Sequence, residues 1–230
     1  MGAQGAVFSA ETFRFFRELG RNNHKEWMDA NRERYRACIV QPFRALLDAL
    51  APAAQRLNPA FDIRGRTGSS FSRINRDIRF ARDKSPYRTQ MYLKFSALGQ
   101  GDDAQLYVGL SADVVTAGFR IYGGSRESCL KRMTIPRAMQ NTAWLARQAR
   151  RLAKKYDSYW YSTEKGAWTR HDGWPLRPEQ WKRMKGWIVR RRMKPVAAAR
   201  AGFPREVARI FQGVFPLYRF AGAPKWKPGR

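Results

Sequence analysis

The feature that most constrains the fold of this chain is an alternation of apolar and polar residues between Met91 and Tyr122. Three successive segments carry it: residues 91–95, 106–110 and 115–121. Alternation predicts strands with one buried face, because successive side chains of a strand point to opposite faces. The links at 99–103 and 111–113 are short turns, so we expect the three strands to lie side by side as an antiparallel meander.

The opposite face of these predicted strands is semi-polar. It carries Tyr92, Lys94, Tyr107, Arg120 and Tyr122. Two interpretations of it are open: the face lines a groove, or it is the solvated face that antiparallel sheets commonly have.

Helical periodicity precedes the strands. The pattern predicts three helices: from Ser9 to Leu19, from a cap at Asn22 and Asn23 to about Ile39, and from Pro42 to about Leu50. Gly20 is expected to end the first helix, and Pro42 is tolerated at the start of the third because its missing N–H has no helical partner there. We expect the aromatic residues of these helices to be core.

The C-terminal part predicts further helices and one strand. These are a helical stretch from Gly123 that Pro136 interrupts, a long helix from Arg137 to Ala153, a strand at 187–189 followed by three arginines, and a helix from Pro204 to about Phe215. Six of the eight tryptophans fall between Trp144 and Trp187, in a strongly basic segment. Exposed Trp stacks on unpaired bases and phosphates favour Lys and Arg, so this segment is a nucleic-acid candidate. Buried tryptophans under a basic surface would give the same pattern.

These elements predict an α+β fold, with a central antiparallel meander flanked by N-terminal and C-terminal helices. No internal repeat or Ser/Gly-rich linker divides the chain. We therefore expect one domain over residues 1–223 and a loose basic tail at 224–230.

The charge balance limits the choice of partners. Forty-five Lys and Arg against 18 Asp and Glu give a net charge of +27. Such a field attracts polyanions, and its range is about 10 Å at 0.1 M salt. Nucleic acid, anionic membranes and phosphorylated small molecules are candidate partners. Alternatively, the basic residues cover every surface and serve no particular partner.

Few residues offer metal or catalytic chemistry. Cys38 and Cys129 form no CxxC pair, and His24 and His171 are the two histidines, so we predict no zinc site. Walker, GxGxxG and GxSxG motifs are absent, and we predict no cofactor. Reduced thiols, the lack of a signal peptide and the lack of a long apolar run favour a cytoplasmic protein without a membrane span.

Residues 70–88, here called the signature loop, are the most informative stretch for function. They contain five Arg and one Lys against Asp77 and Asp83, and they begin like a strand before turning polar. The candidate anion-binding residues are Arg73, Arg76, Arg79, Lys84 and Arg88. Arginine's planar fork holds phosphate or carboxylate through two hydrogen bonds. Asp77 is expected to orient a guanidinium, Phe80 and Tyr87 to wall the site, and Pro86 to fix the path of the chain.

A structural interpretation of the same residues is also open. Arg73, Asp77 and Arg79 would then form a buried ion-pair network that pins the loop to the helices, with Phe80 and Tyr87 as core. Buried charges are costly unless fully paired, which would restrict the residue types without any ligand.

The signature loop resembles that of a known family. Arg73, Arg76, Asp77, Arg79, Phe80, Lys84, Pro86, Tyr87 and Arg88 are spaced as in the bacterial family called domain of unknown function 2461. The resemblance extends to Phe13, Phe16, Leu19, Asn22, Asn23, Trp27, Tyr35 and Pro42. It implies the fold of that family and brings no activity with it.

The function that we expect is recognition of an anionic ligand or nucleic acid through the signature loop and the basic surface. One alternative is an enzyme acting on a phosphorylated or carboxylated substrate at the same loop. Another is a structural adaptor whose basic surface docks acidic proteins. Exposed tryptophans would favour nucleic acid, and a deep pocket containing an acid would favour the enzyme.

Overall fold

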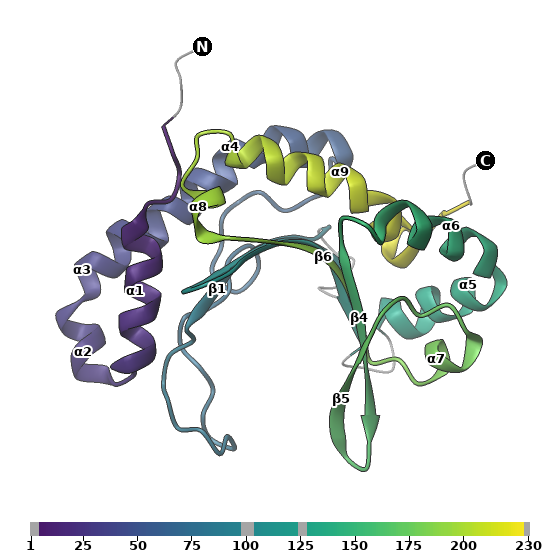
Figure 1. Ribbon diagram of the computed structural model, residues 1–230, viewed down its shortest axis with the longest axis horizontal. Coiled ribbons are helices and arrows are strands. Elements are labelled where there is room, and N and C mark those ends of the chain that lie inside the picture. The colour runs from purple at the N-terminus through teal and green to yellow at the C-terminus, as the bar shows by residue number, and fades with distance from the viewer. Residues whose placement is uncertain (1–4, 98–103, 124–127, 228–230) are drawn as a thin grey trace. The chain divides into compact units, whose positions relative to one another are not determined.

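The computed structural model describes residues 5–97, 104–123 and 128–227 (Figure 1). It is an α+β structure in which helices lie at both ends of the chain and six strands form one antiparallel sheet. The residues divide into two compact units, which we describe in turn. Unit 1 comprises Met1–Phe95, Val108–Thr116 and Met193–Ala208, and unit 2 comprises Ser96–Tyr107, Ala117–Arg192 and Arg209–Arg230.

The sheet has the strand order β1-β2-β3-β6-β4-β5. Its strands are β1 (Gln90–Phe95), β2 (Ala104–Ser111), β3 (Val115–Tyr122), β4 (Asp157–Glu164), β5 (Ala167–Asp172) and β6 (Gly186–Met193). The predicted meander of three adjacent strands is confirmed. Its first turn, at 99–103, lies outside the described residues. The predicted strand at 187–189 is confirmed as part of the longer β6, whereas the hairpin of β4 and β5 was not predicted.

Unit 1 begins with the N-terminal helices. They are α1 (Ala10–Arg21), α2 (Lys25–Ala30), α3 (Arg32–Tyr35), the π-helical turn η1 (Arg36–Val40) and α4 (Gln41–Leu57), and α8 (Pro195–Ala198) follows late in the chain. Pro42 lies in the first turn of α4, as predicted. The prediction of one second helix was wrong, because the chain breaks at Asn31, whose side chain donates to the carbonyl of Trp27.

Two predicted helix boundaries in unit 1 were also wrong. Helix α1 continues through Gly20, since burial of its apolar face outweighs the roughly 0.5–1 kcal/mol that an interior glycine costs. The N-cap of α2 is His24, whose Nδ1 accepts a hydrogen bond from the amide of Trp27. Asn22 instead donates from its side chain to the carbonyl of Glu18, at the end of α1.

Aromatic residues form the core of unit 1. Phe8 contacts Phe43 edge to face at 5.3 Å and Phe203 at 6.0 Å, which ties the N-terminus to α4 and to the start of α9 (Phe203–Gly222). Phe43 in turn contacts Phe71, at 6.5 Å. Buried Thr12 donates from its hydroxyl to the carbonyl of Cys38, which α-helical geometry does not satisfy within η1.

Unit 2 contains the π-helical turn η2 (Leu130–Thr134), α5 (Ile135–Gln140), α6 (Thr142–Leu152), α7 (Pro178–Lys182) and most of α9 (Phe203–Gly222). The prediction that Pro136 interrupts the helical stretch was wrong. Pro136 lies where η2 passes into α5, and the backbone is helical on both sides of it. The break falls at Asn141 instead, so the predicted long helix from Arg137 is two helices. Helix α9 continues past the predicted end at Phe215, through Pro216, to Gly222. Gly124 and Ser125, predicted to begin the helical stretch, lie outside the described residues.

Tryptophan forms the core of unit 2. Trp187 of β6 contacts Phe119 of β3 at 5.6 Å and Trp181 of α7 at 5.2 Å. Trp144 of α6 stacks on Phe220 of α9, with ring centroids 4.9 Å apart. Four of the six tryptophans between Trp144 and Trp187 are buried: Trp144, Trp160, Trp181 and Trp187. Most of this segment's tryptophans are therefore core residues, not a surface for bases.

The segment that follows α9 also contacts this core. Trp226 lies edge to face against Trp144 at 5.1 Å and Phe220 at 5.0 Å. Arg137 donates to the carbonyl of Pro224, at 3.0 Å. The single domain and the loose tail remain predictions.

Each helix in the described parts of the chain is too short or too polar to span a bilayer.

Candidate functional site

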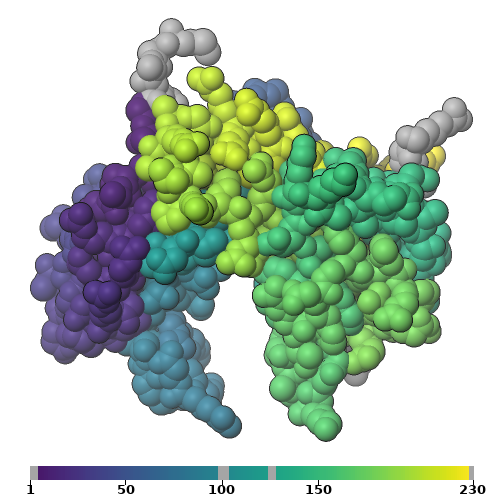
Figure 2. Space-filling model, viewed as in Figure 1, coloured from purple at the N-terminus to yellow at the C-terminus, as the bar shows by residue number. Residues whose placement is uncertain are grey.

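The signature loop of unit 1 is a hydrogen-bonded arm. Ser72 donates its amide to the carbonyl of Tyr92 at 2.9 Å, and Arg76 donates to Pro86 at 2.8 Å, so the two sides of the loop run antiparallel. The prediction that the loop begins as a strand was wrong. Phe71 and Asn75 form isolated bridges instead. In Figure 2 the arm stands out from the rest of unit 1 as a blue lobe.

Asn23 fastens the arm to the N-terminal helices. Its Nδ2 donates to the carbonyl of Tyr87 at 2.9 Å, and its Oδ1 accepts from the amide of Tyr87 at 3.0 Å. The Tyr87 ring is buried, whereas Pro86, before it, is half-buried. Asn23, which the sequence predicted as a helix cap, is thus a clamp for the arm.

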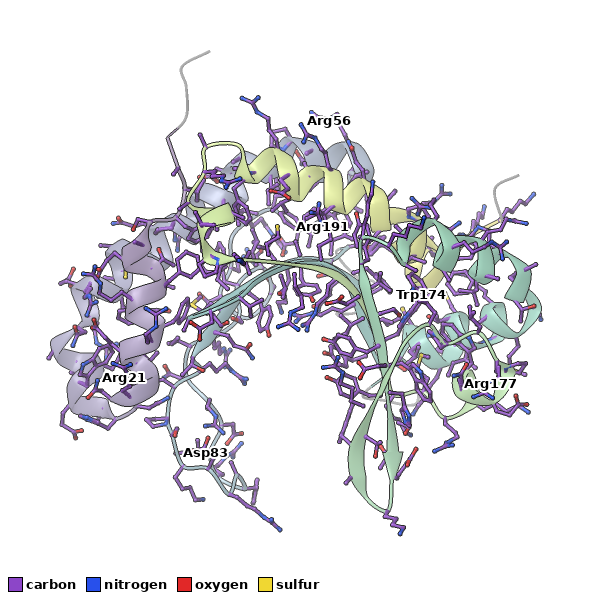
Figure 3. All side chains as sticks on the ribbon, viewed as in Figure 1. Arg21, Arg56, Asp83, Trp174, Arg177 and Arg191 are labelled. Atoms are coloured by element: carbon purple, nitrogen blue, oxygen red, sulfur yellow. The ribbon has the colours of Figure 1, made fainter. Side chains whose placement is uncertain are left out.

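The charged residues at the tip of the arm pair with one another. Arg76 donates to Asp83 at 2.5 Å and to the carbonyl of Ser85 at 3.0 Å. Arg79 forms a two-pronged pair with Asp77, from Nε at 2.9 Å and Nη2 at 2.7 Å. Lys84 donates to backbone carbonyls of the same tip. Figure 3 places Asp83 toward the free end of the arm.

Hydrogen bonds lower the carboxylate pKa values at this tip. Ser85, through its hydroxyl and its amide, and then Arg76 hold the pKa of Asp83 well below its usual range. The side chain of Arg79, followed by its amide, lowers the pKa of Asp77. Both acids are therefore ionised at neutral pH, and they neutralise the two arginines beside them.

The structure contradicts the interpretation of this tip as a buried network. The side chains of Arg79 and Asp77 are 76% and 60% exposed, so their pair lies in solvent. Phe80 is 95% exposed, and the expectation that it is core was wrong. Only Tyr87 of the two expected core aromatics is buried. The tip is held by local hydrogen bonds, which need no burial.

A groove of about 380 Å³ lies at the base of the arm in unit 1. Arg73 of the signature loop lines it, together with Arg44 of α4, Asn75, Phe43, Phe71 and Tyr35. Neither Arg73 nor Arg44 forms an ion pair or side-chain hydrogen bond with another described residue. Burial raises the pKa of Tyr35 to about 12, so its hydroxyl stays protonated beside these cations.

The candidate residues are therefore divided between two places. Arg73 borders the groove, whereas Arg76, Arg79 and Lys84 lie at the tip, and neither Phe80 nor Tyr87 lines the groove. Arg88 is exposed and, like Arg73, has no side-chain partner among the described residues. Sequence reasoning missed Arg44, because an arginine on the polar side of a predicted helix carries no distinguishing signal.

Unit 2 holds a cavity of about 430 Å³ that brings titratable residues together. Trp160, His171, Asp172, Arg177, Glu179 and Arg183 line it, and Arg177 lies at the start of α7 (Figure 3). His171 stacks on Trp160 at 4.0 Å, and its Nε2 lies 2.8 Å from Ser162 Oγ and 3.3 Å from Glu164 Oε1. A catalytic triad needs serine and acid on opposite ring nitrogens. Here both contact Nε2, and Ser162 is fully buried, so this trio holds the hairpin of β4 and β5 together.

The described residues contain no group of three or more His, Cys, Asp or Glu placed to bind a metal ion.

Comparison with known families adds to this geometry. The model of the family described as conserved hypothetical protein (DUF2461) matches residues 11–220. The chain belongs to this family. The matched range takes in both units, from α1 to α9, and therefore both the groove and the cavity beside α7. No curated protein sequence matches the chain. The description of DUF2461 states no activity, so the evidence for a function comes from the residues of the chain.

Proposed function

We propose that the protein binds an anionic ligand in the groove at the base of the signature arm. The observation that supports this most is the pair of arginines, Arg73 and Arg44, which line one groove and have no partner among the described residues. Two unpaired guanidinium groups at a concave surface favour a phosphate or carboxylate, which accepts two parallel hydrogen bonds from each fork.

The other lining residues indicate the chemistry of the uncharged part of the ligand. Phe43, Phe71 and Met91 are buried residues of unit 1 that contribute to the wall, while Ser72 and Asn75 offer hydrogen bonds. Ligand sites commonly combine apolar walls with a few placed polar groups. The proposed ligand is therefore a small molecule with an apolar or aromatic body and one anionic group.

Arg73 is a better anion ligand than the arginines at the tip. A ligand that recruited Arg79 would have to displace Asp77, and one that recruited Arg76 would have to displace Asp83. Arg73 has no internal carboxylate to lose. The tip residues then shape the arm, and the groove provides the binding energy.

Binding is favoured over catalysis at this groove. Its described lining contains no carboxylate, imidazole or thiol. Such groups are the commonest general acids and bases, and a serine or threonine nucleophile such as Ser72 or Thr67 would need one beside it as a base. We also propose a cytoplasmic location, because Cys38 and Cys129 are free thiols, as in proteins of reducing compartments.

Titration calorimetry with phenyl phosphate and with benzoate tests this proposal, since the two probes share an aromatic ring and differ in the anion. Arg73→Gln and Arg44→Gln should each weaken binding about tenfold or more, because a hydrogen bond to a charged group contributes about 1.5–3 kcal/mol. Arg82→Gln, an exposed arginine of the same loop without a side-chain partner, is the matched control and should change affinity less than about twofold. Equal losses in all three variants, or no binding to the unaltered protein, would overturn the proposal.

A further inference from the structure

One face of the unit 2 sheet carries a layer of arginine and tyrosine side chains. The Arg–Tyr layer, as we call it, consists of Tyr107 (β2), Arg120 (β3), Arg190 (β6), Tyr159 (β4) and Arg170 (β5). The guanidinium of Arg120 lies 4.8 Å from the centre of the Tyr107 ring. Tyr159 is held between two guanidinium groups, with Arg170 at 4.1 Å and Arg190 at 4.9 Å. None of these residues lines the groove of unit 1.

Glycine makes room for this layer. A Cβ on Gly118 of β3 would lie 2.2 Å from the carbonyl oxygen of Val189 and 2.7 Å from the Cα of Arg190. A Cβ on Gly186 of β6 would lie 2.6 Å from the ring of Tyr122. The two glycines therefore let β3 and β6 approach closely and let the tyrosine ring lie against the sheet.

Arg190 of this layer has an acid near it but makes no direct ion pair with a described carboxylate. Asp157, opposite Arg190 in the register of β4 and β6, attracts its charge. The Nε of Arg190 is buried without a hydrogen-bond partner among the described residues. Its side chain does hydrogen-bond Tyr107, a neutral group. A further acid of this sheet, Asp172, accepts from Arg170 at 2.5 Å. A half-buried guanidinium without a direct ion pair can still bind a further acceptor, so Arg190 is suited to an acceptor that comes from a ligand.

Aromatic rings continue from this arginine along the hairpin of β4 and β5. Tyr161 contacts Tyr159 at 5.7 Å and Trp168 at 5.8 Å, and it stacks with Tyr122 at 6.4 Å. Trp168 is 58% exposed, the one large aromatic of unit 2 reported as exposed among the described residues. The face thus presents a cation site next to a row of rings that ends in solvent.

We propose that this face binds single-stranded nucleic acid, with a backbone phosphate at Arg190 and bases stacked on Trp168 and Tyr161. Stacking on aromatic side chains requires unpaired bases, whereas a duplex hides their faces. Arg190 supplies the charge-assisted hydrogen bonds that a phosphate accepts. The net charge of +27 favours a polymer with many phosphates over a single anion.

The test uses the full chain and a fluorescently labelled oligothymidine of about 12 nucleotides, within the usual site sizes of such surfaces. Binding is followed by fluorescence anisotropy at fixed salt. Trp168→Ala should weaken affinity about tenfold, as expected for the loss of one base-stacking ring. Arg190→Gln should weaken it by about tenfold or more, because the loss of a guanidinium–phosphate pair leaves the phosphate without its fork.

Matched variants separate this site from general charge. Arg147→Gln removes one exposed arginine from α6 of the same unit and should change affinity less than about twofold. Leu176→Ala, at a partly exposed apolar residue, is the control for Trp168→Ala. Arg190→Lys keeps the charge and loses the fork, so it should still weaken binding, and it serves if Arg190→Gln does not fold.

The outcomes are distinct. Equal losses for Arg147→Gln and Arg190→Gln would overturn the proposal in favour of a diffuse basic surface. A duplex of the same length that competes as well as the single strand would also overturn it. Arg73→Gln should bind the oligonucleotide like the unaltered protein, so the failure of this proposal is separable from failure at the groove of unit 1.

Discussion

Three described arginines lie in different surroundings, and each guanidinium has a different task. Arg79 pairs with Asp77 in solvent and shapes the tip of the arm. Arg64 pairs with the buried Asp62 and stabilises a turn. Arg73 has no partner and borders a groove. The residue type is the same in each case, so the partner decides whether an arginine is structural or available to a ligand.

Asp62 makes the free energy of unfolding depend on pH in the acid range. Its carboxylate accepts from Arg64 Nε at 2.8 Å and from the Arg64 amide at 3.0 Å. The side-chain hydrogen bond from Arg64 lowers the pKa of Asp62 from 3.8 to about 2. Because the folded-state pKa is depressed, this stabilisation is complete above about pH 4 and is lost as the pH falls towards 2.

Asp62→Asn should therefore lower the free energy of unfolding by about 1–3 kcal/mol at neutral pH. Urea unfolding between neutral pH and acid measures the effect. The variant should lose less stability than the unaltered protein across the range in which Asp62 titrates. Parallel acid profiles for the two proteins would show that Asp62 contributes nothing.

The Arg79–Asp77 pair should contribute little to stability. Exposed pairs contribute about 0–1 kcal/mol, because water screens the attraction and two side chains lose freedom. Thermal unfolding of Arg79→Ala, Asp77→Ala and the double variant should give values within about 1 kcal/mol of the unaltered protein. A larger coupling energy in this cycle would mean that the pair fixes more than the tip.

Part of the candidate site was predictable from the sequence. The charge density of residues 70–88 made this segment the candidate site, and Arg73, one of its candidate residues, borders the groove. What the sequence does not encode locally is which acid each arginine meets. Arg79 and Asp77 are two residues apart, but Arg44 reaches the groove from a separate helix. Arg190 joins the Arg–Tyr layer through strand pairing, which adjacent residues do not reveal.

At the scale of whole elements, a strand was predictable where apolar and polar residue types alternate in its sequence. Strands β1 to β3 alternate apolar and polar residue types clearly, so the meander was predicted, although β2 is buried on both faces. Strand β4 has Trp160 and Ser162 on one face and Tyr159 and Tyr161 on the other, and all but Tyr161 are buried. Three consecutive aromatic residues, Tyr159 to Tyr161, leave no alternation of residue type to detect. The π-helical turns η1 and η2 likewise leave no periodic signal.

Replacement of Gly118 tests whether the close approach of β3 and β6 contributes to stability. Gly118→Ala places a methyl group against backbone atoms that cannot rotate away, so we expect a loss of about 1–3 kcal/mol or more in the free energy of unfolding. Gly202→Ala is the control, because a Cβ there meets nothing within 4 Å. Denaturant unfolding compares the two. A neutral Gly118→Ala would mean that the strands separate without cost.

At the scale of the whole molecule, the excess of positive charge is the dominant feature. With 45 basic and 18 acidic residues, most cations have no acid to pair with. Like charges repel in the compact state more than in the expanded chain, so they lower stability. The fold tolerates this repulsion because aromatic cores in both units bury the apolar side chains.

Salt should therefore stabilise the protein. Raising sodium chloride from roughly 0.01 M to 0.1 M shortens the Debye length from about 30 Å to about 10 Å, and the free energy of unfolding should rise by on the order of 1 kcal/mol. Thermal unfolding across this range measures the change. Sodium sulfate at matched ionic strength is the control. It should stabilise the protein as much as sodium chloride if screening alone acts, and more if sulfate binds at specific sites. Falling stability would show that attractive ion pairs outweigh repulsion.

The clamp at Asn23 has a consequence for how a protease would cut the chain. Arg79, Arg82 and Lys84 lie exposed at the tip of the arm, where trypsin reaches the backbone easily. A cut there leaves the hydrogen bonds from Ser72 to Tyr92 and from Asn23 to Tyr87 intact. The nicked protein would then travel as one particle under native conditions and separate into pieces of roughly one third and two thirds only when denatured.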